Sequence, residues 1–176
     1  MKIAGQILSG RNTTVVELRR PDIGPIHLTV QALPLGFESL LAERGIRRPA
    51  VPKRVARDSR GKVIRDEAHE AVLHADPGDL DYQRQLEAYA RRTLCLEVVE
   101  GLAADSSVAF DTQPPGGDGD WAAYADAIYE ELQTAGFSDG DLVVLVQAIH
   151  RVSNLTEEAI RAAQNDFFRD RPEATS

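Results

Sequence analysis

The sequence predicts an α+β fold, in which a small antiparallel β meander precedes a bundle of about four helices. Two contrasting spacings of apolar residues indicate this fold. Before Pro34 apolar residues recur at every second position, as in a strand with one buried face, whereas after Asp79 they recur at helical spacing. We therefore divide the chain into a β meander with a short helix at 1–46, a basic connector or arm at 47–78, and a helical domain at 79–176.

Three strands are expected before residue 34. The third is the clearest, because apolar and polar residues alternate along 26–32. A β-branched run opens the second strand at 13–19, and 2–8 forms the first. The turn residues at 9–12 and 21–25 would join neighbouring strands as hairpins, which together make the meander.

A three-stranded meander with one apolar face needs a cover. Phe37, Leu40 and Leu41 follow the last strand on a short predicted helix that ends near Gly45. Their place in the sequence suits them to cover the sheet.

The connector at 47–78 has an unusual composition. Pro49 and Pro52 interrupt any helix, and 58–62 carries a turn signal between apolar residues. These signals fit a hairpin arm or a loop equally well. Residues 47–65 contain 8 basic residues and 1 acidic residue, a local charge of +7, while the remainder has 12 basic and 27 acidic residues, or −15.

A charge run of this kind is usually a solvated connector that folds back on acidic surface. The sharper interpretation is a docking arm for an acidic partner or a nucleic acid, and the lack of interleaved aromatic residues to stack bases favours the acidic partner. For that role the candidate partner-binding residues are Arg47, Arg48, Lys53 and Arg54.

Helical spacing accounts for most of the chain after Asp79. Asp79 or Asp81 caps a helix that runs to about Ala103, and its second half is apolar nearly all round, so that end should lie in the core. A linker at 111–120 precedes a second helix, which starts at Asp118 or Asp120 and ends at Gly136.

Two capping signals predict the last helices. Ser138 and Asp141 approximate a capping box for a helix that ends at Val152. Asn154 and Glu157 repeat the device for a final helix. No internal repeat is apparent along the chain.

The composition restricts the function. The 176 residues, 43% of them hydrophobic, can build a compact core. The single cysteine, Cys95, lies in an aliphatic stretch, which indicates a buried thiol in a reducing cytoplasm. The longest apolar run, Leu142–Val146, is too short to cross a bilayer. A net charge of −8 argues against a nucleic-acid partner.

The sequence contains no convincing catalytic constellation. His69 and His74 are five residues apart and so do not share a helical face, which excludes a recognised zinc spacing. An aliphatic helix is also a poor setting for a reactive Cys95 thiolate. We therefore expect a protein that is not an enzyme and that holds no cofactor or metal.

The aromatic residues concentrate at one place in the chain. Such a stripe is usually core, but Trp and Tyr are also common interface anchors. The second set of candidate partner-binding residues is Trp121, Tyr124, Ile128, Tyr129 and Phe137.

An ordered series of loose motifs spans about residues 34–155. Asp79–Leu86 begins a helix with acidic residues and a tyrosine. Tyr89–Leu94 continues it with arginines and then apolar residues. Trp121–Leu142 combines an aromatic helix, a Gly-Phe turn and an Asp-Leu helix start, and Arg57–Lys62 precedes them as a turn. This series resembles the tail assembly chaperones of long-tailed, siphovirus-type bacteriophages.

The resemblance implies a non-enzymatic function in the host cytoplasm. Such a chaperone binds the tape-measure protein transiently and recruits tail-tube protein around it, with possible self-association. The competing interpretation is a structural virion component, such as a head-to-tail joining or baseplate protein, which would use the basic arm and a β edge for permanent contacts.

Overall fold

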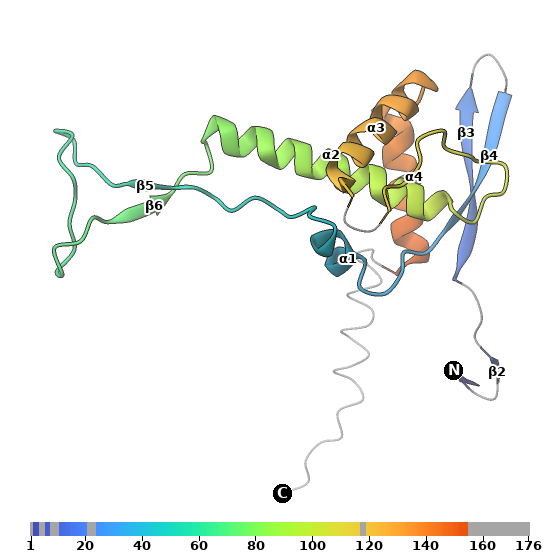
Figure 1. The fold of residues 1–176 in the computed structure, drawn as a ribbon, viewed down its shortest axis with the longest axis horizontal. Helices are drawn as coiled ribbons and strands as arrows, with labels where there is room; N and C mark the ends of the chain where they lie inside the picture. Colours follow the sequence, from blue (N-terminus) through green and yellow to red (C-terminus); the bar gives the residue numbers. More distant parts are fainter. Residues whose placement is uncertain (1, 4–5, 8–10, 21–23, 117–118, 155–176) are drawn as a thin grey trace, which may run out of the picture.

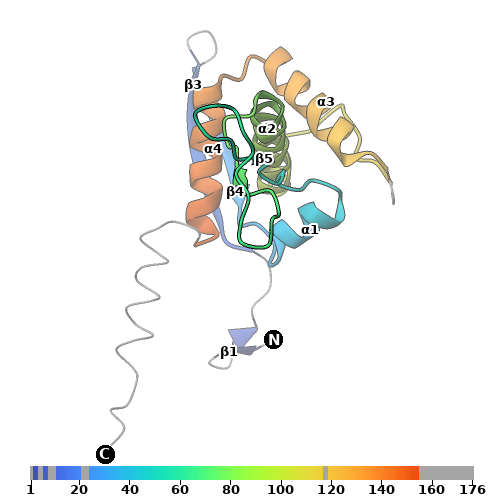
Figure 2. The ribbon, with the colours of Figure 1, turned by 90° about the vertical axis from the view of Figure 1, so that its left-hand side faces the viewer.

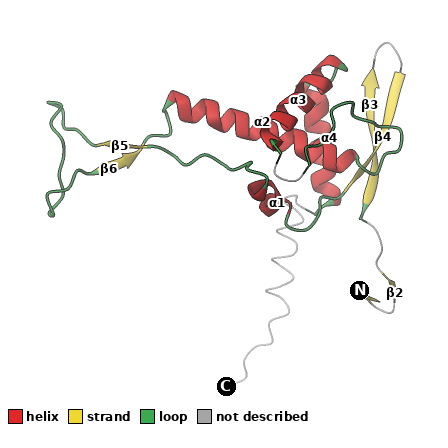
Figure 3. Ribbon diagram, viewed as in Figure 1, coloured by secondary structure: helices red, strands yellow, loops and turns green. Residues whose placement is uncertain are grey.

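The computed structural model describes residues 2–3, 6–7, 11–20, 24–116 and 119–154. It has the predicted α+β fold, with antiparallel β structure near the N-terminus followed by helices (Figure 3). A β hairpin packs against a helical body, and a long arm leaves that body between α1 (Phe37–Glu43) and α2 (Leu80–Leu102) (Figure 1).

The second and third predicted strands form an antiparallel hairpin, as expected. β3 (Thr13–Arg20) pairs with β4 (Gly24–Gln31) in a register that places Val16 opposite Leu28. The alternation of apolar residues gives this hairpin one buried face. That face consists of Val16, Leu18, Leu28 and Val30.

The first predicted strand does not join this hairpin in the described part of the chain. Instead, β1 (Lys2–Ile3) pairs with β2 (Gln6–Ile7), so the opening segment pairs with itself and the expected three-stranded meander is wrong in this detail. Only Ala4 and Gly5 separate these strands in the sequence, which is the length of a two-residue hairpin connection.

α2 is the central helix of the body. It contacts α3 (Trp121–Thr134), α4 (Asp139–Val152) and β4, and its second half is buried as predicted. Gly101 belongs to this buried half, and its missing side chain makes room for Ile149 of α4. One hydrophobic cluster therefore unites the β hairpin with the helices.

The apolar face of the hairpin is covered by α4 and α2 rather than by α1, which corrects the expectation from the sequence. α4 contacts both β3 and β4 (Figure 2), and it buries Leu142, Leu145 and Ile149. Phe37 and Leu41 of α1 are buried in the same cluster. With four buried residues, α4 presents a broader apolar face than the two buried residues of α1.

The helix starts follow the predicted caps. Asp79 accepts hydrogen bonds from the backbone amides of residues 81 and 82, Asp120 from that of residue 123, and Ser138 with Asp141 forms a complete capping box. The predicted final helix, after Asn154, lies outside the described residues.

The connector forms a hairpin arm, which decides between the two alternatives that the sequence left open. β5 (Lys53–Val55) and β6 (Leu73–Ala75) pair antiparallel, with Arg54 opposite His74. Both strands are exposed, and the arm projects from the start of α2 away from the body (Figure 1).

Candidate partner-binding surface

The root of the arm is tied to the N-terminus of α2 by one arginine. The Nε atom of Arg54 lies 2.5 Å from Oδ2 of Asp76, and its Nη2 atom donates to Oδ2 of Asp79 at 2.9 Å. The other Asp79 oxygen caps α2 by accepting from the amides of Asp81 and Tyr82. The Tyr82 amide, and then Arg54, hold the pKa of Asp79 below its ordinary value.

Beyond β5 the arm divides into two lobes that share an eight-residue pattern. Residues 56–63 read ARDSRGKV and residues 64–71 read IRDEAHEA, with Arg-Asp at the same place in each. Antiparallel bridges close the lobes, between Arg57 and Val63 in the first and between Arg65 and Ala71 in the second. The chain therefore contains a short internal repeat, contrary to the expectation from the sequence.

An aspartate organises each lobe in the same way. Oδ1 of Asp58 accepts hydrogen bonds from the amides two and four residues later, both at 2.9 Å. Oδ1 of Asp66 does the same, at 3.0 and 2.9 Å. These bonds satisfy the backbone of each turn, so neither lobe needs a core to define its shape.

The arginine before each aspartate braces the same turn. Arg57 donates to the carbonyl oxygen of Gly61 at 2.8 Å, and Arg65 donates to that of His69 at 2.6 Å. Gly61 and His69 both have left-handed backbone, with φ of 79° and 62°. Only the glycine adopts this conformation at no steric cost, and the different residue types conceal the repeat in the sequence.

The lobes meet the stem in a ring of three backbone hydrogen bonds. The amide of Ala56 donates to Val72, that of Val72 donates to Ile64, and that of Ile64 donates to Ala56, at 2.8 to 2.9 Å. These residues are eight apart, so the ring occupies the same place in the pattern each time. The tip is thus a defined three-way junction.

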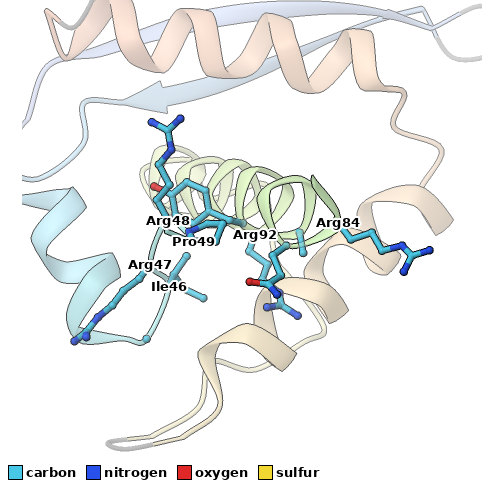
Figure 4. Close-up of a pocket in the computed structure, with 10 residues that line it drawn as sticks. Ile46, Arg47, Arg48, Pro49, Arg84 and Arg92 are labelled. Carbon is cyan, nitrogen blue, oxygen red and sulfur yellow. The ribbon is translucent and has the colours of Figure 1, made fainter. Parts of the chain in front are cut away.

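A groove of about 540 Å³ lies where the arm begins, between residues 45–49 and the first half of α2. Ile46, Pro49 and Tyr89 give it apolar walls. Arginines contribute most of its charge, and Figure 4 shows that Arg47, Arg48 and Arg84 point in different directions. They therefore border the groove and do not converge on a single anion.

The groove arginines differ in their partners. Arg92 makes a bidentate pair with Asp126 of α3, in which Nε donates to Oδ1 at 3.0 Å and Nη2 donates to Oδ2 at 2.6 Å. This contact lowers the pKa of Asp126. Arg84 pairs with Asp81, and Arg47 donates to the carbonyl oxygen of Ala42.

Arg48 makes no side-chain hydrogen bond or ion pair within the described part of the chain. Arg48 and Arg47 were candidates from the sequence, whereas Arg84, Tyr89 and Arg92 were missed. Their shared position on one side of α2 follows from the helical spacing 84, 88 or 89, and 92.

The aromatic cluster is divided between core and surface. Tyr124 and Ile128 are buried in the hydrophobic cluster, so they are not available to a partner in this fold. Trp121 meets Tyr124 edge to face at 5.6 Å and is half-buried. Tyr129 and Phe137 are half-buried as well.

Each half-buried ring lies beneath an arginine of the chain itself. The guanidinium carbons of Arg44, Arg91 and Arg20 lie 3.7, 5.2 and 5.0 Å from the ring centres of Trp121, Tyr129 and Phe137, respectively. These contacts occupy part of the surface that the sequence suggested for a partner. Partner binding by the three rings stays a prediction.

Three observations concern other chemistry. Cys95 is fully buried, as expected, and burial raises the pKa of its thiol to about 11. His150 lies 3.1 Å from Glu97, whose pKa burial raises. In the described ranges no three His, Cys, Asp or Glu residues are arranged to hold a metal ion.

None of the helices described here is long and apolar enough to cross a membrane. Comparison with known protein families, with curated proteins and with solved structures gives no match to this chain.

Proposed function

We propose that this chain is a non-enzymatic tail assembly chaperone of a long-tailed bacteriophage. It binds the tape-measure protein in the host cytoplasm and helps to recruit tail-tube subunits. The observation that carries the proposal is the groove at the root of the arm, which has apolar walls and a border of arginines. The segments that resemble such chaperones, Arg57–Lys62 and Asp79–Leu94, build the first lobe and one wall of this groove.

The groove suits an amphipathic helix with acidic residues beside its apolar stripe. Its volume accommodates a few apolar side chains, which the half-buried Pro49 and Tyr89 would contact. Arg48 and Arg84 are exposed at its border, where they would attract carboxylates of the client and exclude basic segments. A tape-measure protein is a long helical chain, so it offers stripes of this kind.

Co-expression with the tape-measure protein of the same phage tests the proposal. The tagged chain should retain it in a pull-down, and Arg48→Glu should weaken binding by about tenfold or more, since it places a negative charge beside the client's carboxylates. Arg60→Glu is the matched control, because it makes the same change on the arm far from the groove. Retention that Arg48→Glu leaves unchanged would exclude the groove as the binding site.

The projecting arm also favours the second candidate function, a structural virion component that makes permanent contacts. Exposed strands such as β5 and β6 are suited to assembly. The two functions differ in where the protein is found once the particle has assembled. A chaperone should be present in infected lysate and absent from purified particles, whereas a joining or baseplate protein stays in the particle.

A further inference from the structure

The two lobes of the arm have the same backbone pattern but opposite surface charge. The first lobe carries Arg60 and Lys62, and the second carries Glu67 and Glu70. Lys62 and Glu70 occupy equivalent places, since each amide donates to the aspartate of its own lobe. All four side chains are exposed, and none makes a hydrogen bond or ion pair within the described ranges.

The other charged side chains named in the lobes make hydrogen bonds to the backbone of their own lobe. Arg57 and Arg65 donate to backbone carbonyl groups, and Asp58 and Asp66 accept from backbone amides. Each lobe has one such arginine and one such aspartate, whose charges cancel, so the net charges are +2 on the first lobe and −2 on the second. They cancel over the tip as a whole.

The two lobes extend to opposite sides of the stem at the end of the arm (Figure 1). Ile64 connects them and is 43% exposed. The paired stem residues Val55 and Leu73 are also exposed. The tip thus presents apolar side chains between a basic lobe and an acidic lobe.

We propose that this tip binds the tip of a second copy of the same chain. A two-fold axis perpendicular to the stem, and to the line through the lobes, sets each basic lobe against the acidic lobe of the other copy. The two Ile64 side chains then lie near the axis. An acidic protein surface would attract Arg60 and Lys62 but repel Glu67 and Glu70, whereas a second copy complements both lobes.

The arm also reduces the repulsion between two acidic bodies. Residues 49–56 run outward over roughly 25 Å if they are extended. Two arms joined tip to tip then separate the bodies by several Debye lengths, each roughly 8 Å at physiological salt. The net charge of −8 on each copy therefore opposes this contact only weakly.

A tip contact is small, so the association should be weak and concentration-dependent. Sedimentation velocity of the intact chain should show a mass that rises toward the dimer as concentration increases toward about 1 mM, and less so at about 1 M salt, where the Debye length is roughly 3 Å. A chain that stays monomeric at low salt over this range overturns the proposal.

Paired charge reversals give the sharper test. Arg60→Glu with Lys62→Glu makes both lobes acidic, and Glu67→Lys with Glu70→Lys makes both basic. Each variant alone should self-associate about tenfold or more weakly than the natural chain, since like charges then face each other. An equimolar mixture of the two should associate again, because every basic lobe then meets an acidic one.

The lobes should keep their shape in these variants, since only exposed side chains change and the amide donors to Asp58 and Asp66 remain. Arg48→Glu with Lys53→Glu is the control, which makes the same charge change outside the lobes and should leave self-association intact. A mixture that fails to associate, or a control as defective as the lobe variants, overturns the proposal. Tape-measure binding at the groove is measured separately and does not depend on this result.

Discussion

Gly101 determines how closely α2 approaches α4, and thereby the position of the helix that carries both the groove and the root of the arm. A Cβ atom at this position would overlap Cδ1 of Ile149 and lie 2.6 Å from its Cγ1. Ile149 is fully buried, so it has little room to move. Gly101→Ala should therefore overpack the core, which costs about 1–3 kcal/mol.

Helix propensity acts in the opposite direction. Replacing glycine by alanine inside a helix stabilises it by about 1 kcal/mol when no clash occurs. The net effect of Gly101→Ala is then a loss of up to about 2 kcal/mol in the free energy of unfolding. Ala90→Gly, on an exposed face of the same helix, calibrates the propensity effect and should cost about 1 kcal/mol.

The effect of Gly101→Ala on the free energy of unfolding should change sign when the side chain of Ile149 is shortened. Ile149→Ala alone should cost about 2–5 kcal/mol, because it leaves a cavity. In that background Gly101→Ala should raise the free energy of unfolding by about 1 kcal/mol. Urea denaturation followed by circular dichroism measures the free energy of unfolding of the natural chain, the two single variants and the double variant. If Gly101→Ala stabilises the natural chain, then the described approach of α2 to α4 is wrong.

Three further predictions concern other parts of the body. Ile128→Ala should lower the free energy of unfolding by about 2–5 kcal/mol in urea denaturation, against less than about 0.5 kcal/mol for the exposed Val143→Ala; equal losses would contradict the burial of Ile128. The pKa of Asp126 is depressed in the folded chain, chiefly by its hydrogen bond to Arg92, so its contribution is present above the unfolded pKa and lost as pH falls through the folded one. Asp126→Asn should accordingly reduce the loss of unfolding free energy as the pH falls into the acid range. An unchanged loss would refute the pairing of Asp126 with Arg92. Cys95, with a pKa of about 11, should react with a thiol reagent at about pH 8 far more slowly in the folded than in the unfolded chain.

Local signals predicted the helical part of the fold well. Asp79, Asp120 and Ser138 each accept hydrogen bonds from amides of the first turn, a requirement that depends on nearby residues alone. The partners of the strands were harder to predict. A strand at residues 2–8 suits pairing either with itself or with residues 13–19, and the alternation of apolar residues does not distinguish the two.

The candidate site was only partly predictable for a similar reason. The spacing of Trp121, Tyr124 and Ile128 identified one face of α3, but the same spacing serves a core face and a docking face. Packing against α2 buries Tyr124 and Ile128. The groove was missed because its walls come from segments about forty residues apart, which only the tertiary fold brings together.

The basic arm shows why a charge count overestimates a cationic surface. Of the residues that give 47–65 its charge of +7, Arg54 is paired with two aspartates at the root, while Arg57 and Arg65 donate to carbonyl groups inside the lobes. Arg54 is thereby neutralised, while Arg57 and Arg65 shape the lobes, and the aspartate that follows each of them offsets its charge. The positive charge that remains lies in separate places, at the groove, at Lys53 on the stem and on the first lobe. The two proposed contacts, at the groove and at the tip, can therefore be told apart by separate substitutions at Arg48 and at Lys62.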